Sequence, residues 1–194
     1  MVFRAGLMVV GLAALSGCGG SSGGGTPVAP VPEVPPALEA NRFSTVSAQS
    51  RALILKYNNA APTPALPTTG SATYSGTVGF HRTGYVEAGT RPEQIGDITL
   101  NTDFAAQTFN GAVRGVVTTS DNPLTGQMDI VNGTMVGGLL VAPVQSTLGL
   151  APGSAPQSGS MVGVMYGPNA EAVSGTINAP VGSGPSNGFF IAER

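Results

Sequence analysis

Apolar residues recur along the chain with two different periods, which divide it into a short helical region and a longer region built of strands. Between residues 41 and 57 they return every three or four positions, a spacing that predicts one amphipathic helix with Asn41 as its N-cap. The predicted helix would cover the end or the side of a sheet. A helix that lies on a membrane is disfavoured, because the polar face carries only two cations. The stripe is formed by Phe43, Val46, Ser50, Leu53 and Tyr57, the cations are Arg51 and Lys56, and Pro62, Pro64 and Pro67 follow the helix.

Beyond Thr69 apolar and polar residues alternate, which is the pattern of half-buried antiparallel strands. Turns are expected near Ala106-Gln107 and at Asn132-Gly133, a dipeptide that is a strong signal for a two-residue hairpin. A loop rich in Gly, Pro and Ser is expected over residues 143–158. The predicted strands are 72–80, a short one near 84–88, 96–104, 109–117, one from 128 to the hairpin, 135–141, 161–166, 172–179 and 188–192.

Eight to nine short strands with no later helix predict a β-sandwich or a β-barrel. Closure into a barrel removes the exposed sheet edges, but the alternation alone does not distinguish the two folds. Glycines inside several predicted strands suit the sharp bends of a small barrel. These glycines are Gly76, Gly111, Gly163 and Gly175.

The N-terminal segment has the layout of a secretory signal peptide. One basic residue, Arg4, precedes an apolar run over residues 5–15, which is shorter than the ~20 residues of a membrane-spanning helix. The run ends in Leu15-Ser16-Gly17-Cys18, which resembles the lipobox of bacterial lipoproteins, and Cys18 is the only cysteine. The resemblance implies cleavage before Cys18 and a covalent lipid on its sulfur. The alternative is that Cys18 is an incidental small residue beside an ordinary cleavage site.

Four regions follow from these patterns. Residues 1–17 form the predicted signal peptide, 18–37 a lipidated Gly/Pro-rich tether, 38–65 the short amphipathic helix with a linker, and 66–194 the strand-rich domain. The tether has too little apolar surface to pack a core, so it is expected to be disordered. The alternative for its second half is a proline-rich segment that binds the groove of a partner.

Composition excludes several classes of function. Charged residues make up 9% of the chain, its formal net charge is −2, and it has no basic patch, which argues against nucleic-acid binding. If Cys18 is acylated, the mature chain has no free thiol, so disulfides, redox chemistry and thiolate metal sites are excluded.

The sequence offers few candidates for a chemical site. His81 is the only histidine, and it is a weak candidate for a haem ligand together with Tyr85 or Tyr166. A solvated loop residue is the preferred interpretation of His81, and a histidine-based metal cluster is excluded. No Gly-x-Ser-x-Gly motif is present, and the acidic residues lack the spacing of an acid/base pair, so no enzyme is predicted. These acids are Asp97, Asp103, Asp121 and Asp129; four methionines, Met128, Met135, Met161 and Met165, are expected in the core.

The C-terminal third narrows the fold. Residues 165–176, with the run Tyr-Gly-Pro-Asn-Ala-Glu, and the terminal stretch 188–194 resemble the end of the β-barrel domain of transferrin-binding protein B. Residues 66–76 resemble the first strand of its single-barrel relatives, and 103–111 resemble the family's hairpin between the third and fourth strands. The resemblance implies an all-β fold, a small eight-stranded antiparallel β-barrel preceded by a short helix, on a disordered N-terminal tether. The chain departs from the full receptors in having room for one barrel and no handle domain, and in Ser174, where the family has glycine.

The resemblance also implies a function. Members of this group are acylated surface or periplasmic lipoproteins, and some bind transferrin, haemoglobin or haem. The implied protein is anchored in the outer membrane, has no cofactor besides its covalent lipid, and is a non-enzymatic binder of a host or environmental protein or of an iron- or haem-related ligand. Gly19 after the cysteine favours the outer membrane. The alternative is a structural outer-envelope lipoprotein without a soluble ligand.

The expected contact surface is a set of loops. A barrel of this size is either filled by side chains or just able to hold one small ligand, and the many Phe, Met, Ile and Val residues favour filling. A ligand is therefore expected to contact the loops 81–95, 118–127 and 143–159 rather than the interior.

Overall fold

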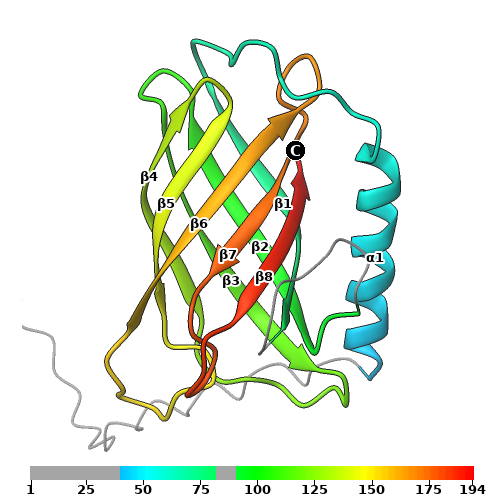
Figure 1. Ribbon diagram of the computed structural model, residues 1–194, viewed down its shortest axis with the longest axis vertical. Helices are drawn as coiled ribbons and strands as arrows, with labels where there is room; N and C mark the ends of the chain where they lie inside the picture. The colour runs from blue at the N-terminus through cyan, green and yellow to red at the C-terminus, as the bar shows by residue number, and fades with distance from the viewer. Residues whose placement is uncertain (1–39, 82–90) are drawn as a thin grey trace, which may run out of the picture. The chain divides into compact units, whose positions relative to one another are not determined.

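A computed structural model describes residues 40–81 and 91–194 of the chain. The predicted lipid site at Cys18, the tether and the predicted short strand near 84–88 lie outside these residues. Within the described residues a single helix, α1 (Arg42–Tyr57), precedes eight strands (Figure 1). The strands are β1 (Ser71–His81), β2 (Gln94–Asp103), β3 (Thr108–Thr118), β4 (Met128–Val136), β5 (Leu139–Ser146), β6 (Gln157–Tyr166), β7 (Ala172–Asn178) and β8 (Asn187–Glu193).

The eight strands form a closed barrel, in which each pairs antiparallel with its neighbour in sequence and β8 pairs with β1. In the closing pair, Val78 of β1 lies opposite Phe190 of β8. The predicted eight-stranded barrel with a preceding helix is confirmed, and the sandwich alternative is wrong. The hairpin at 103–111 is present and, within the described residues, joins β2 to β3 rather than a third to a fourth strand.

The hairpin predicted at Asn132-Gly133 is wrong. β4 runs through both residues to Val136, and the chain turns at Gly137-Gly138, whose φ angles are 57° and 85°. Asn132 has a φ of 51° and the pairing with β5 shifts register around it, so the dipeptide forms an irregularity within the strand. Gly133 pairs with Phe109, and a Cβ on this glycine would lie 2.5 Å from the phenyl ring. The glycine therefore makes room for Phe109 instead of forming a turn.

Two further boundaries differ from the predictions. The returning strand predicted at 135–141 is β5, which begins only at Leu139. The loop predicted over 143–158 narrows to 147–156, because β5 continues past Pro143 and β6 begins at Gln157. Pro143 lies opposite Ser160 of β6 and its side chain is exposed. Proline lacks the N–H that most strand positions need, which is why the sequence pattern placed it in a loop.

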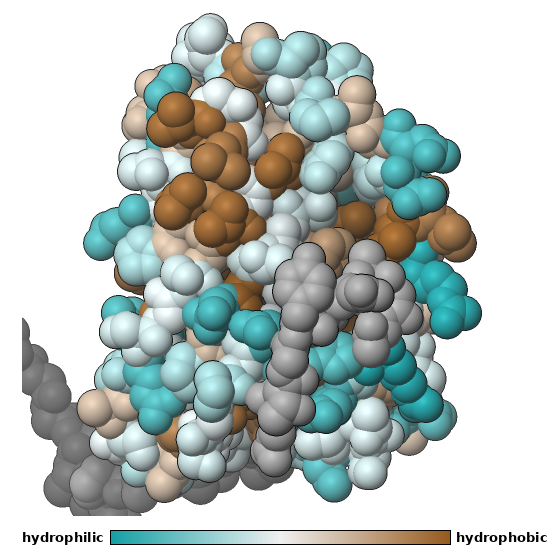
Figure 2. Space-filling view, viewed as in Figure 1, coloured by the Kyte–Doolittle hydropathy of each residue, from teal (hydrophilic) through white to brown (hydrophobic). Residues whose placement is uncertain are grey.

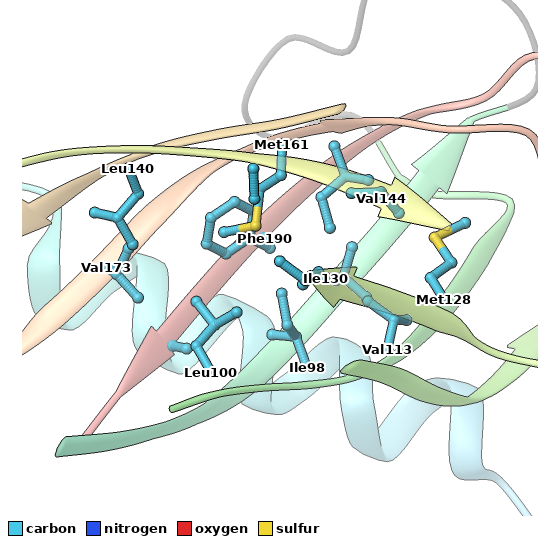
Figure 3. Packing of buried hydrophobic residues seen from close by; sticks show 14 of the residues in the cluster. Ile98, Leu100, Val113, Met128, Ile130, Leu140, Val144, Met161, Val173 and Phe190 are labelled. Atoms are coloured by element: carbon cyan, nitrogen blue, oxygen red, sulfur yellow. The ribbon is translucent and has the colours of Figure 1, made fainter. Parts of the chain in front are cut away.

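Side chains from all eight strands fill the barrel interior (Figure 3). Tyr74, Leu100 and Phe190 are fully buried there. The Tyr74 hydroxyl donates a hydrogen bond of 2.6 Å to the carbonyl oxygen of Ala170, and burial raises the pKa of Tyr74 to about 12. The prediction that the four strand methionines lie in the core is confirmed for Met128, Met135, Met161 and Met165.

The helix α1 packs against the outer surface of the barrel, as its apolar stripe predicts. Phe43 and Val46 form a small buried cluster with Ile95 of β2 and Val117 of β3. Asn41 occupies the N-cap position, but its φ is 71° and its side chain makes no capping hydrogen bond. Among the described residues no helix has the length and hydropathy needed to cross a bilayer.

Candidate functional site

Because side chains fill the barrel interior, a binding site is expected on the outside of the barrel. Three loops lie at the end where β3, β5 and β7 finish, which is the lower end in Figure 1. We call this surface the loop end and define it by residues 119–127, 147–156 and 179–186. The other end carries the short connections 104–107, 137–138 and 167–171.

Backbone hydrogen bonds join the three loops into one layer. Gly149 N–H donates to Thr125 O at 2.7 Å, and Gly182 N–H donates to Leu148 O at 2.8 Å. Leu148 and Val181 are buried and belong to the barrel core. The loops therefore close this end of the interior and hold their exposed residues in one arrangement, which lowers the entropic cost of binding a partner there.

The first turn of α1 is attached beside the loop end. The Phe43 N–H donates to Asp121 Oδ1 at 2.6 Å, so a carboxylate from loop 119–127 replaces the missing cap of Asn41. Arg42 forms an ion pair with Asp97 of β2. The ring of Phe43 also lies 5.4 Å from the guanidinium of Arg91, close enough for a cation–π contact.

A groove with a mixed polar and apolar lining runs between the middle of α1 and the strands β1, β2 and β8. It has a volume of about 470 Å³ and is lined by Gln49, Leu53, Thr77, Asp97 and Glu193 among others. Thr77 is 2% exposed, and its hydroxyl oxygen has no hydrogen-bond partner. Asp97 and Glu193 are already paired with Arg42 and Lys56, so the groove offers hydroxyl and amide groups rather than a free charge.

The ion pair at the other end of α1 predicts a pH dependence of stability. Lys56 Nζ and the Tyr57 hydroxyl donate to Glu193 Oε2 at 2.6 and 2.9 Å. The hydrogen bond from Lys56 lowers the pKa of Glu193 below its ordinary value of 4.5. A carboxyl whose pKa falls on folding stabilises the protein above its unfolded-state pKa, and this contribution is lost as the pH falls through the folded-state pKa.

Glu193→Gln is therefore expected to lower the free energy of unfolding by less than about 1 kcal/mol at neutral pH, because the Glu193 side chain is partly exposed. As the pH falls through the folded-state pKa of Glu193, the wild-type protein also comes to carry a neutral group at this position, so the difference should shrink. Urea unfolding of both proteins at neutral pH and over a series of acidic pH values measures the difference. A difference that does not change with pH would contradict the assignment.

The haem-ligand candidates do not come together. His81 ends β1 and pairs with Asn187, the first residue of β8. Tyr166 pairs with Ala172, whose other partner is Glu193, the last residue of β8. His81 and Tyr166 therefore lie at opposite ends of the barrel, and Tyr85 lies outside the described residues. Within residues 40–81 and 91–194 no three His, Cys, Asp or Glu side chains gather where they could hold a metal ion.

The four aspartates considered for acid/base chemistry each support local structure. Asp97 pairs with Arg42, and Asp121 caps α1. Asp103 accepts hydrogen bonds of 2.9 and 3.0 Å from two backbone N–H groups of the turn that follows β2. Asp129 accepts hydrogen bonds from the Gln127 amide. Sequence reasoning missed the partners of Asp97 and Asp121 because they come from distant segments, and those of Asp103 because they depend on the geometry of the turn.

Comparison with known proteins identifies one family. The sequence model of the C-lobe and N-lobe β-barrels of transferrin-binding protein B matches residues 66–194, which include all eight strands. A search of curated proteins found no match.

Several solved structures are similar to the chain. Transferrin-binding protein B of isotype 1 from Neisseria meningitidis serogroup B has 17% identity and a TM-score of 0.47, over 69% of this chain and 27% of that chain. A variant of transferrin-binding protein B from Actinobacillus pleuropneumoniae H49 has 16% identity and a TM-score of 0.46, over 69% and 65%. The N-lobe of lactoferrin-binding protein B of Moraxella bovis has 15% identity and a TM-score of 0.42, over 65% and 60%. The chain spans less than two thirds of each of these structures.

Proposed function

The chain belongs to the family of transferrin-binding protein B β-barrels, and we propose that it is a non-enzymatic binding protein, anchored in the outer membrane by a lipid on Cys18. Its ligand is a protein of the iron-carrier kind for which the family is named. The lipobox-like run before Cys18 and the family membership support the anchor.

The main observation behind the proposed binding surface is that side chains fill the barrel interior. Since buried side chains from every strand occupy the barrel, a ligand has to bind on the outside. The loop end is the best candidate, because its loops are joined by backbone hydrogen bonds and present exposed residues in a preorganised layer. The loop end includes parts of two of the three loops expected to contact a ligand, 118–127 and 143–159, whereas most of the third, 81–95, lies outside the described residues.

A binding assay with two matched variants tests the proposal. The full chain, purified in mild detergent, is titrated with transferrin, lactoferrin, haemoglobin and haem. Ala155→Arg places a long charged side chain on the exposed loop 147–156, and Ala105→Arg does the same in the exposed turn at the other end of the barrel. We expect saturable binding of transferrin or lactoferrin, weakened about tenfold or more by Ala155→Arg, which is about 1.4 kcal/mol, and unchanged by Ala105→Arg.

Three outcomes would contradict parts of this proposal. Absence of saturable binding to every ligand would favour the structural envelope lipoprotein. Loss of binding in Ala105→Arg alone would place the ligand at the opposite end. Binding of haem alone, lost in His81→Ala, would revive the ligand role of His81.

A further inference from the structure

One side of the barrel carries a cluster of exposed aliphatic side chains. Val136, Leu139, Val141 and Val162 are 72%, 43%, 44% and 43% exposed. Val136 lies opposite Leu139 across β4 and β5, and Val141 lies opposite Val162 across β5 and β6, so the four are neighbours. We call them the apolar wall. Figure 2 shows the hydrophobic atoms gathered on the upper part of the face formed by these strands.

The apolar wall lies within a long stretch of sequence that has no acidic or basic side chain. From residue 130 to residue 170 the chain contains no Asp, Glu, Lys, Arg or His. This stretch includes all of β5 and β6 and the loop between them. Bringing the wall into contact with an apolar phase therefore removes no charge from water, which is the most costly part of such a transfer.

The wall lies on the opposite side of the barrel from α1. The helix packs against β1, β2, β3 and β8, and β5 is four strands from β1 in either direction around the closed ring. Contact through the wall would thus leave the helix, its ion pairs and the groove facing away from the surface that is bound.

The composition and size of the wall argue against a second protein molecule as its occupant. Three strand widths and a few residues of rise cover roughly 200–300 Å², whereas a stable protein interface buries about 800 Å² on each partner. The residues that usually dominate such interfaces are Trp, Tyr and Arg, and the wall contains only Val and Leu. Lipid needs no complementary shape, so a small aliphatic surface suffices.

The length of chain before α1 supports a lipid surface. Cys18 lies 24 positions before Arg42, where α1 begins. A chain of that length spans at most about 80–86 Å even when it is fully extended. A lipid on Cys18 would therefore hold the barrel within that distance of the bilayer, at high effective concentration. A weak apolar contact is then enough to orient the barrel.

We propose that the apolar wall rests on the bilayer that anchors the chain, with Val136, Leu139, Val141 and Val162 at the boundary between headgroups and acyl chains. The proposal rests on the lipid anchor of the proposed function. The chain carries a negative net charge, so we expect it to bind a zwitterionic bilayer better than an anionic one.

Site-specific fluorescence on vesicles tests the contact. The lipidated full chain is reconstituted in phosphatidylcholine vesicles that contain a doxyl-labelled lipid as quencher. Because acylation consumes Cys18, Val141→Cys and Ala48→Cys each provide one thiol for a polarity-sensitive dye, the first in the wall and the second on the exposed side of α1. We expect a blue shift and several-fold stronger quenching at position 141 than at position 48.

A matched pair of charge substitutions tests whether the wall itself makes the contact. Val136 is 72% exposed and Leu55, on α1, is 70% exposed, so aspartate at either position disturbs no packing. In the chain labelled at position 141, Val136→Asp should abolish the blue shift and the quenching, and Leu55→Asp should leave both unchanged.

The failures of the two proposals are distinguishable. If the chain does not float with the vesicles, the anchor is wrong, and the wall proposal falls with it. If it floats but the dye at 141 behaves like the dye at 48, the anchor stands and the wall proposal is overturned. Energy transfer between dyes at 141 without quenching by doxyl lipid would identify a second copy as the occupant and would also overturn it.

Discussion

Phe190→Ala is expected to lower the free energy of unfolding by about 3–5 kcal/mol, the range for removing a buried phenyl ring. Phe190 is fully buried in the interior (Figure 3). Its ring extends from β8 toward β6, where a Cβ on Gly163 would lie 2.9 Å from the end of the ring. The backbone of a closed barrel cannot collapse inward without breaking strand pairs, so the cavity left by the ring would persist. This puts the expected loss in the upper half of the range.

Urea unfolding followed by far-UV circular dichroism measures this loss, since the chain contains no tryptophan for fluorescence. Phe189→Ala is the matched control. Phe189 is the preceding residue, lies half-buried on the outer face and lines a small hollow beside Tyr57 of α1. Its loss should cost only about 1 kcal/mol. Equal losses in the two variants would show that the interior packing is not what holds the barrel together.

Much of the barrel could be predicted from the alternation of apolar and polar residues, because each strand has one face in the core and one in water. The pattern failed where a local signal competed with a distant contact. Asn132-Gly133 and Gly137-Gly138 are both turn sequences, and the local chain does not reveal which one turns. The choice depends on Phe109, whose ring needs the space at Gly133. Such a contact becomes visible only when the register of β3 and β4 is known.

The candidate site was less predictable, because it depends on how distant segments meet. Asp121, which caps α1, lies 78 positions after Phe43, and no local sequence pattern near either residue predicts the hydrogen bond between them. His81 and Tyr166 are both strand-end residues, and only the direction of the strands places them at opposite ends. The charge-free stretch at 130–170 is visible in the sequence. Only the structure shows that β5 and β6 place this stretch on one side of the barrel, where it forms an uncharged surface.

Gly175→Ala is expected to lower the free energy of unfolding by about 2–3 kcal/mol, because it overfills a contact between two backbones. A Cβ at this position would lie 2.0 Å from the carbonyl oxygen of Val162. That oxygen belongs to the pairing of β6 with β7, so it cannot move aside as the end of a flexible side chain could. Glycines in the strands were predicted to allow bends. At position 175 glycine is required for another reason, because β6 lies so close that no Cβ fits there.

The matched control for this substitution is Gly184→Ala in the loop between β7 and β8. A Cβ there would meet no atom within 4 Å, and the backbone of Gly184 does not have the positive φ that favours glycine. Alanine restricts the unfolded chain, so this variant should be more stable by about 0.4–1 kcal/mol. The two variants make the same chemical change, one at a crowded strand position and one at an open loop position, so opposite signs in urea unfolding would attribute the loss to the crowding at Gly175. A loss in both variants, or in neither, would mean that the close contact of β6 and β7 at Gly175 does not limit what the barrel wall accepts.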